Sequence, residues 1–115
     1  METIHTEFDK EINAYIVNFP SRVVLDVLKL WGSIFSEELE GQSGKVGLLL
    51  NTNAHDFDSI ECLKWLKEYL TKETVVVSHV SRVAFVQPAE YRSPEVISKS
   101  EAYFANIEDA MEWLN

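Results

Sequence analysis

The segment that decides the fold is VGLLL at residues 46–50, which runs directly into the polar loop NTNAHDF at residues 51–57. The five residues of the first stretch are apolar without alternation, as in a strand that is covered on both faces. Beyond the loop, Asp58 and Glu61 have the spacing of a helix cap, and a helix is expected from Ser59 to about Lys72. The apolar face expected for this helix consists of Ile60, Leu63, Leu66 and Leu70. A buried strand that leads into a helix predicts a parallel sheet at the centre of the protein.

Upstream of this segment, the sequence predicts a hairpin followed by a long helix. Residues 4–8 and 12–19 are rich in strand-forming residues and are separated by a polar step. From Val23 to Leu39 the apolar residues recur at helical spacing. Ser21 stands where an N-cap would be, and Gly41 stands where a helix commonly ends, so we expect both to bound this helix.

Downstream, the pattern is clear except in one stretch. Thr74 to Val80 fits either a strand or a continuation of the preceding helix, and both interpretations stay open. Strands are expected from Arg82 to Gln87 and from Glu101 to Ala105. Between them, the run from Ser93 to Ile97 begins like a short helix, with an N-cap, a first-turn proline and an acid. Asn106 has the position of a cap for a final helix.

The elements therefore follow the order ββαβαβαβα, and no linker or repeat divides residues 1–115. Strands that alternate with helices form a mostly parallel sheet, and the initial hairpin makes this sheet mixed. We predict a single α/β domain in which a mixed, mostly parallel sheet is flanked by helices.

The composition narrows the classes of function. Of the 115 residues, 46% are hydrophobic, and 19 acidic against 10 basic residues give a formal net charge of -9. Such a surface repels phosphate backbones and anionic headgroups, so we expect no nucleic-acid partner and no electrostatic membrane binding. No apolar run approaches the ~18 residues of a transmembrane segment, and no signal peptide is readable. With one cysteine, Cys62, and hence no intrachain disulfide, a soluble cytoplasmic protein is expected.

Three stretches carry a resemblance to a known family: residues 46–66, the run SRVAFV at residues 81–86, and the closing pattern EAYF and IEDAMEWL within residues 101–114. Together they resemble the STAS superfamily (sulfate transporter and anti-sigma-factor antagonist domains), and within it the SpoIIAA-like branch. The resemblance spans nearly the whole chain and implies one STAS-like domain over residues 1–115. It also implies a non-enzymatic binding or regulatory domain of the cytosol that recognises a protein partner or a small apolar ligand.

The same resemblance implies an apolar cavity between the sheet and the helices. Its candidate wall consists of Trp31, Phe35, Phe85 and Tyr103. As an alternative function, STAS switch proteins are phosphorylated on a serine that opens the helix after the third strand, and Ser59 falls at that place. A phosphate there would meet the like charge of Asp56, Asp58 and Glu61, which opposes an anti-sigma-antagonist type of switch.

The polar loop supports a second alternative, a small enzyme. Its candidate side chains are Asn51, Asn53, His55, Asp56 and Asp58. They follow a strand, where open α/β sheets commonly present a ligand, but they lack the acid and glycine pattern of a calcium loop. Short polar residues of this kind are typical of a strand-to-helix turn. We therefore expect no catalytic residue, no metal and no cofactor.

Two aromatic residues of the second predicted helix suggest an interface. Trp65 and Tyr69 lie off its expected apolar face, and exposed aromatic residues often mark protein contacts. A homodimer through this helix is the resulting hypothesis. Cys62 lies beside Leu63 inside the helix, so a small core residue is expected there, not a nucleophile.

Overall fold

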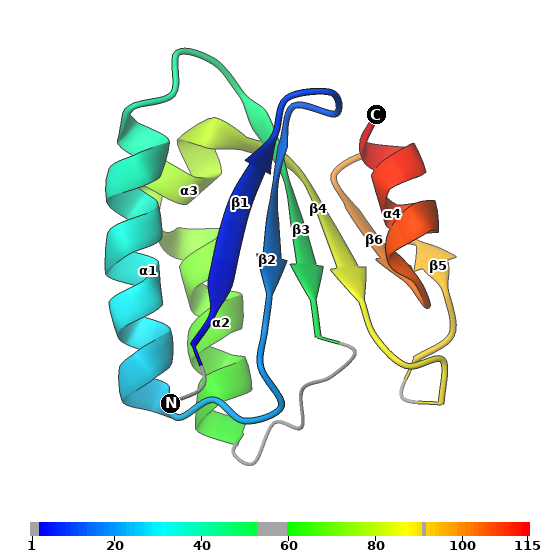
Figure 1. The fold of residues 1–115 in the computed structure, drawn as a ribbon, viewed down its shortest axis with the longest axis horizontal. Coiled ribbons are helices and arrows are strands. Elements are labelled where there is room, and N and C mark those ends of the chain that lie inside the picture. Colours follow the sequence, from blue (N-terminus) through cyan, green and yellow to red (C-terminus); the bar gives the residue numbers. More distant parts are fainter. Residues whose placement is uncertain (1–2, 53–59, 91) are drawn as a thin grey trace.

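The computed structural model describes residues 3–52, 60–90 and 92–115 (Figure 1). Within these ranges, six strands form one sheet in the order β1-β2-β3-β4-β6-β5. The strands are β1 (His5–Asp9), β2 (Ala14–Asn18), β3 (Val46–Asn51), β4 (Val80–Val86), β5 (Glu95–Val96) and β6 (Glu101–Phe104). Strands β2, β3, β4 and β6 run parallel, and the edge strands β1 and β5 pair antiparallel to their neighbours. The predicted mixed, mostly parallel sheet is confirmed.

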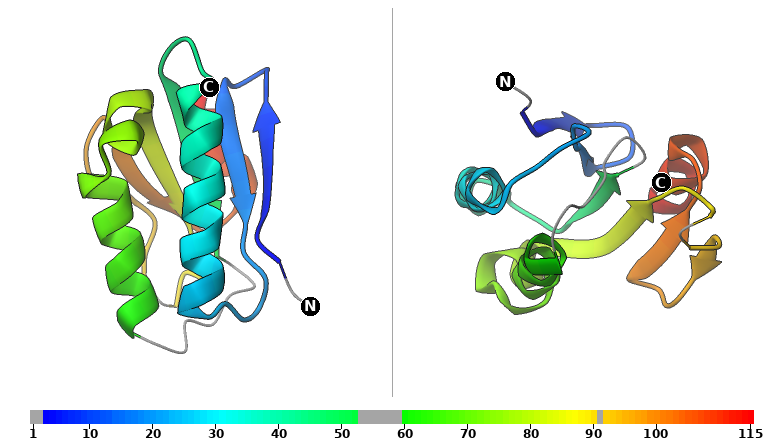
Figure 2. Two further views of the ribbon diagram at one scale, coloured as in Figure 1. Left: turned by 90° about the vertical axis from the view of Figure 1, so that its left-hand side faces the viewer. Right: turned by 90° about the horizontal axis from the view of Figure 1, so that it is seen from below.

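Helices flank the sheet on both faces (Figure 2). The helices are α1 (Leu25–Glu40), α2 (Ile60–Lys72), α3 (Thr74–His79) and α4 (Ile107–Leu114). Helices α1, α2 and α3 lie on one face, and α4 lies on the other, against β3, β4 and β6. Seen along the strands, α1 and α2 lie over the part of the sheet from β1 to β4, while β6 and β5 extend beyond α2 (Figure 2). None of the described helices combines the length and the apolarity that crossing a membrane requires.

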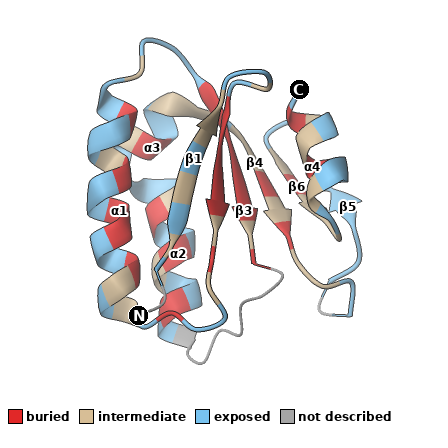
Figure 3. Cartoon of the chain, in the orientation of Figure 1, coloured by how far each residue is buried: buried red, intermediate tan, exposed pale blue. Residues whose placement is uncertain are grey.

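Strand alternation divides the buried residues into two clusters, one on each face of the sheet. The cluster under α1 and α2 includes Tyr15, Val17, Leu28, Trp31, Phe35, Leu39, Leu48, Leu50, Leu66 and Tyr69. The cluster under α4 consists of Ala14, Ile16, Leu49, Ala84, Val86, Ala110 and Leu114. All five apolar residues of β3 are buried, as predicted for a strand that is covered on both faces (Figure 3).

Gly47 lies within the apolar run of β3 at a point where α4 packs closely against the sheet. A Cβ atom here would lie 3.0 Å from Leu114 Cδ2 and 3.1 Å from the Cβ of Ala14. A larger side chain would push α4 away from the sheet, so the absence of a side chain is what permits the contact.

The predicted hairpin is confirmed, and its turn is held by an asparagine. Strands β1 and β2 pair from His5 opposite Asn18 to Asp9 opposite Ala14. Asn13 precedes β2 with a φ of 52°, in the left-handed region that asparagine enters more readily than most residues. Its side-chain amide donates to the Lys45 carbonyl oxygen at 3.1 Å, which ties the hairpin to the start of β3.

Of the two predicted boundaries of α1, the start is wrong and the end at Gly41 is confirmed. The N-cap residue is Val24, not Ser21, and it makes no side-chain capping bond. The helix starts later than predicted because Phe19 and Val23 are both buried in the core, and the chain between them is non-helical. At the other end Gly41 has a φ of -80°, so it ends the helix without using a left-handed conformation.

The stretch that both interpretations fitted, Thr74 to Val80, is mostly helical. A break at Glu73, which is extended, separates α3 from α2, and β4 begins at Val80. Three consecutive valines favour a strand, yet Val76 is 1% exposed and packs into the core beside α1. Tertiary packing therefore overrides the intrinsic preference of this segment.

The helix predicted after Ser93 is wrong, because the chain forms strand β5 there. Glu95 pairs with Tyr103 and Val96 pairs with Ala102 in an antiparallel ladder. A turn at residues 98–100 follows at once, which leaves too few residues to nucleate a helix, and β-branched Val96 favours the extended form. The observed order of the described elements is ββαβααβββα.

The final helix begins as predicted. The Asn106 side-chain oxygen accepts a hydrogen bond from the Asp109 backbone N–H at 2.9 Å. At its other end, Arg82 of β4 donates to the Trp113 carbonyl oxygen at 2.7 Å and lies over the Trp113 ring. Both ends of α4 are thus held by polar contacts that satisfy free backbone groups.

Candidate functional site

A cavity of about 660 Å³ lies where α2 and α3 face strands β4 and β6. Its apolar lining consists of Leu63, Leu66 and Leu70 of α2, Val76 and Val77 of α3, Val80, Val83 and Phe85 of β4, Tyr103 of β6, and Ile97. The cavity arises because α2 does not extend over β6, while α4 covers only the opposite face (Figure 2). Its volume falls in the range of about 300–1,000 Å³ that is typical of small-molecule sites.

Strand alternation decides which residues reach this cavity. Phe85 and Tyr103 point to the face of α2, whereas their neighbours Ala84 and Ala102 are buried toward α4. On β6, Glu101 points the same way as Tyr103 and also lines the cavity. The open face of β4 and β6 therefore supplies two aromatic rings and one carboxylate.

Apolar side chains around the cavity remain in contact with solvent. Leu63 is 45% exposed, Val77 is 51% exposed and Ile97 is 45% exposed. Leu63 lies on α2, Val77 lies on α3, and Ile97 directly follows β5, so three separate parts of the chain contribute them. Exposed apolar side chains that gather around a cavity often mark a place where another molecule binds.

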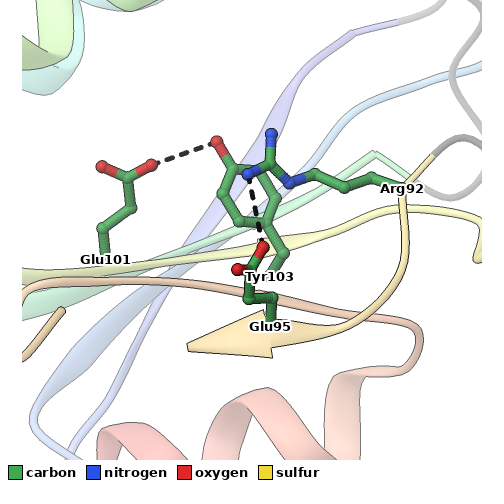
Figure 4. A network of polar contacts seen from close by, with 4 residues as sticks. All are labelled: Arg92, Glu95, Glu101 and Tyr103. Atoms are coloured by element: carbon green, nitrogen blue, oxygen red, sulfur yellow. Dashed lines mark hydrogen bonds and ion pairs between the residues drawn. The ribbon is translucent and has the colours of Figure 1, made fainter. Parts of the chain in front are cut away.

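The stacked rings of Phe85 and Tyr103 line the cavity. Figure 4 shows the Arg92 guanidinium over the Tyr103 ring of this pair. The rings of Phe85 and Tyr103 are 4.8 Å apart between centroids and nearly parallel, at 14°. The Arg92 Cζ atom lies 3.8 Å from the centroid of the Tyr103 ring, a cation–π contact. Phe85 reaches Tyr103 from β4, whereas Arg92 precedes β5 on the opposite side of β6.

Polar contacts complete this stack (Figure 4). The Tyr103 hydroxyl donates to Glu101 Oε2 at 3.1 Å, and an Arg92 nitrogen lies 3.8 Å from Glu95 Oε2. Burial raises the pKa of Tyr103 above its ordinary value of 10.0. The hydrogen bond and the charge of Glu101 raise this pKa further, against the opposing charge of Arg92. The phenol therefore stays protonated near neutral pH and acts as a donor.

The structure separates the four residues that were predicted to form the cavity wall. Phe85 and Tyr103 line the cavity, but Trp31 and Phe35 do not. These two rings are 6% and 2% exposed and stack on each other in the core under α1. The Trp31 indole N–H donates to the Thr6 hydroxyl oxygen at 2.9 Å, which fixes it against β1. Trp31 and Phe35 do not reach the cavity because α1 covers this half of the sheet and keeps both rings inside the core.

The predicted exposure of Tyr69 is wrong, and Trp65 is half-buried. Tyr69 donates to the Gly32 carbonyl oxygen at 2.9 Å, and Ser36 Oγ lies 2.8 Å from the same hydroxyl. The Trp65 ring stacks on the Tyr69 ring. A Cβ atom at Gly32 would lie 2.5 Å from the Cη2 atom of Trp65, so only a glycine fits there. Both rings therefore form the contact between α1 and α2, and the homodimer prediction loses the exposed surface on which it rested.

The buried face of α2 is rotated from the predicted one. It carries Cys62, Leu66 and Tyr69, while Leu63 turns toward the cavity. The rotation follows from α1, whose Gly32 receives the rings of α2. The prediction that Cys62 is a core residue is confirmed, at 3% exposure.

Most of the predicted loop site, together with the predicted phosphorylation site, lies outside the described residues. The residues concerned, which the structure does not describe, are Asn53, His55, Asp56, Asp58 and Ser59. Asn51 is described and ends β3, where its side-chain amide donates to Asn18 Oδ1 at 2.8 Å. The phospho-switch at Ser59 and the enzyme based on this loop stay predictions.

The other residues of the cavity lining were not predicted as site residues, and four of them matter for the proposals below: Lys67, Val77, Arg92 and Ile97. Lys67 had a usable signal, because it follows Leu63 by four residues and so shares its side of the helix. The other three had none, since Val77 belongs to the stretch with two interpretations and Arg92 and Ile97 border the wrongly predicted helix.

Comparison with known proteins supports the fold. No protein-family model matches the sequence, and no curated protein matches it. A solved structure of an uncharacterized protein of the DUF3478 family from Shewanella loihica PV-4, described as having a SpoIIAA-like fold, is similar with a TM-score of 0.68. The similarity covers 100% of this chain and 96% of that chain at 14% sequence identity. The chain thus has a SpoIIAA-like fold, as the resemblance to the STAS superfamily implied.

Proposed function

We propose that this chain is a non-enzymatic binding domain that holds a small apolar molecule in the cavity between α2, α3 and strands β4 and β6. The observation that carries the proposal is the exposure of Leu63, Val77 and Ile97 around a cavity of about 660 Å³. An apolar molecule seated there would remove these side chains from water, at about 25 cal/mol per Å² of apolar surface. The stacked rings of Phe85 and Tyr103 would form its floor.

The polar chemistry of the cavity supports binding over catalysis. The described lining residues include no histidine and no cysteine. The hydroxyl of Ser81 bonds to the Val46 carbonyl oxygen, and that of Ser100 lies within hydrogen-bonding distance of Ser98, so neither is paired with a base. The raised pKa of Tyr103 makes its phenol a poor general base near neutral pH.

Fluorescence titration with N-phenyl-1-naphthylamine, a neutral apolar dye, tests the proposal. We expect saturable binding of one dye per chain. Val77→Asp places a charge at the cavity and should weaken binding at least tenfold, by roughly 1.4 kcal/mol or more. The matched control is Leu30→Asp on α1, since Leu30 is 62% exposed and does not line the cavity.

The control should bind the dye as the wild type does. The proposal fails if the wild type shows no saturable binding, or if both variants lose binding equally. Three predictions remain beside this proposal: a protein partner, the phospho-switch at Ser59 and a small enzyme based on the loop of residues 51–58. No contact among the described residues favours any of them.

A further inference from the structure

Basic residues outnumber acidic ones in the described lining of the cavity, whereas acidic residues outnumber basic ones in the chain as a whole. Among the described residues of the lining, Lys67 and Arg92 stand against one acidic residue, Glu101. The whole chain has 19 acidic residues and 10 basic ones. The negative side chain of the cavity is also engaged, because Glu101 accepts the hydrogen bond of the Tyr103 hydroxyl. The cavity is therefore a basic site on an acidic protein.

Lys67 has no acidic residue three or four positions away on its own helix, where side chains share a face. The positions three and four residues away are Leu63, Lys64, Leu70 and Thr71. By contrast, Lys64 has Glu61 and Glu68 at these spacings. Among the residues that the structure describes, no carboxylate is at ion-pair distance from the Lys67 ammonium. Lys67 thus presents an uncompensated charge beside Leu63 at the cavity.

Arg92 is held in place but is only weakly neutralised. Its guanidinium lies on the Tyr103 ring, which fixes its plane, and one terminal nitrogen is 3.8 Å from Glu95. The side chains of this ion pair are 44% and 61% exposed, so water screens it strongly. The other terminal nitrogen points away from Glu95 (Figure 4). An oriented guanidinium with a free edge suits a carboxylate, which it can bind with two parallel hydrogen bonds.

We infer that the molecule held in this cavity is an amphiphile with a single carboxylate, which Lys67 and Arg92 bind while its apolar part lies on Phe85 and Tyr103. The inference rests on the proposed function and names the class of ligand. Two cations and one acid give the described lining a net charge of one positive unit, which a ligand with one negative charge neutralises. A dianionic head group would exceed that balance next to Glu101, within a field that the whole chain makes negative.

Three ligands with the same ten-carbon chain test the inference: decanoate, decan-1-ol and decyltrimethylammonium. Each is used to displace N-phenyl-1-naphthylamine from the full chain. We expect decanoate to bind at least tenfold more tightly than decanol, and decyltrimethylammonium to bind more weakly than decanol. Because the contact is electrostatic and partly exposed, the preference for decanoate should shrink in high salt.

Variants then test whether Lys67 and Arg92 cause the preference for decanoate over decanol. Lys67→Gln and Arg92→Gln should each weaken decanoate binding three- to tenfold and leave decanol binding within twofold. The matched controls are Lys64→Gln and Lys99→Gln, since both lysines are exposed and lie outside the lining. Glu101→Gln should strengthen decanoate binding, whereas a merely structural disturbance would weaken it.

The outcomes separate the two proposals. If decanol and the dye bind but decanoate binds no more tightly than decanol, the inference is overturned and the proposed function stands. If decanoate is preferred but the Lys67 and Arg92 variants keep that preference, the inference is also overturned. If neither the dye nor any of the three ligands binds, both proposals fail together.

Discussion

Two pairs of stacked rings on the same face of the sheet have nearly the same geometry but opposite surroundings. Trp31 and Phe35 of α1 stack at 5.2 Å and 11° between the helix and the sheet. Phe85 and Tyr103 stack at 4.8 Å and 14° on neighbouring strands. The first pair is buried because α1 lies over it, and the second faces a cavity because α2 stops short of β6. Coverage by a helix, not ring stacking, separates a core from a site in this fold.

The largest expected difference between the two pairs is in stability. Phe35→Ala removes a ring that is 2% exposed and should lower the free energy of unfolding by about 3–5 kcal/mol. Phe85→Ala, the matched variant of the open pair, should cost only about 1–2 kcal/mol, because its ring is half-buried. Urea denaturation followed by circular dichroism measures both values, and equal losses would contradict the comparison.

A smaller difference is expected between two tyrosine hydroxyls. Tyr69→Phe removes the bond to the Gly32 carbonyl oxygen and the contact with Ser36, and should cost about 1–2 kcal/mol. Tyr103→Phe removes one partly exposed bond and should cost about half of that. Urea denaturation of the two variants beside the wild type tests this order, and a larger loss for Tyr103 would reverse the comparison.

The Tyr69 contribution should also depend on pH. Burial raises the pKa of this phenol above its ordinary value of 10.0, the Ser36 hydrogen bond lowers it, and the charge of Glu73 raises it. Because the folded state holds the proton more tightly, the contribution is complete below the unfolded pKa and falls as the pH rises above 10.0 through the folded pKa. The stability difference between wild type and Tyr69→Phe should therefore be larger at about pH 8 than at about pH 10.5. A difference that does not change, or that grows, would contradict this assignment.

The smallest stability effect is expected at the rim of the cavity. Leu63→Ser should change the free energy of unfolding by no more than about 0.5 kcal/mol, because the side chain is already 45% exposed. It should nevertheless weaken dye binding severalfold. Ile34→Ser on the outer face of α1 is the control, since Ile34 is 57% exposed and does not line the cavity. If Ile34→Ser weakens binding as much, the cavity is not the binding site.

The parts of the fold that local chemistry determines could be predicted from the sequence. The apolar run of β3 and the Asn106 cap each depend on residues within one segment, and both are confirmed. The rotation of α2 could not be predicted, because it depends on how Trp65 and Tyr69 meet Gly32, more than thirty residues away. Strand β5 escaped prediction for the same reason, since its extended form depends on pairing with β6.

The candidate site shows the same limit. Aromatic residues were recognised as wall candidates, but residue type alone gave no means to separate Trp31 and Phe35 from Phe85 and Tyr103. The distinction depends on which strands α2 covers, because β6 extends beyond this helix. That arrangement exists only after the helices have packed on the sheet. Arg92 depends on the same arrangement, because its contact with Tyr103 exists only once β5 has joined the sheet.

The brevity of β5 also bears on how the protein behaves in concentrated solution. At this edge of the sheet, an incoming strand finds only two residues to pair with before it reaches Pro94, which has no N–H group to donate. Short edge strands flanked by proline are a common defence against edge-to-edge aggregation. By occupying the open side of β6, β5 ends the sheet at a place that disfavours pairing with a second chain.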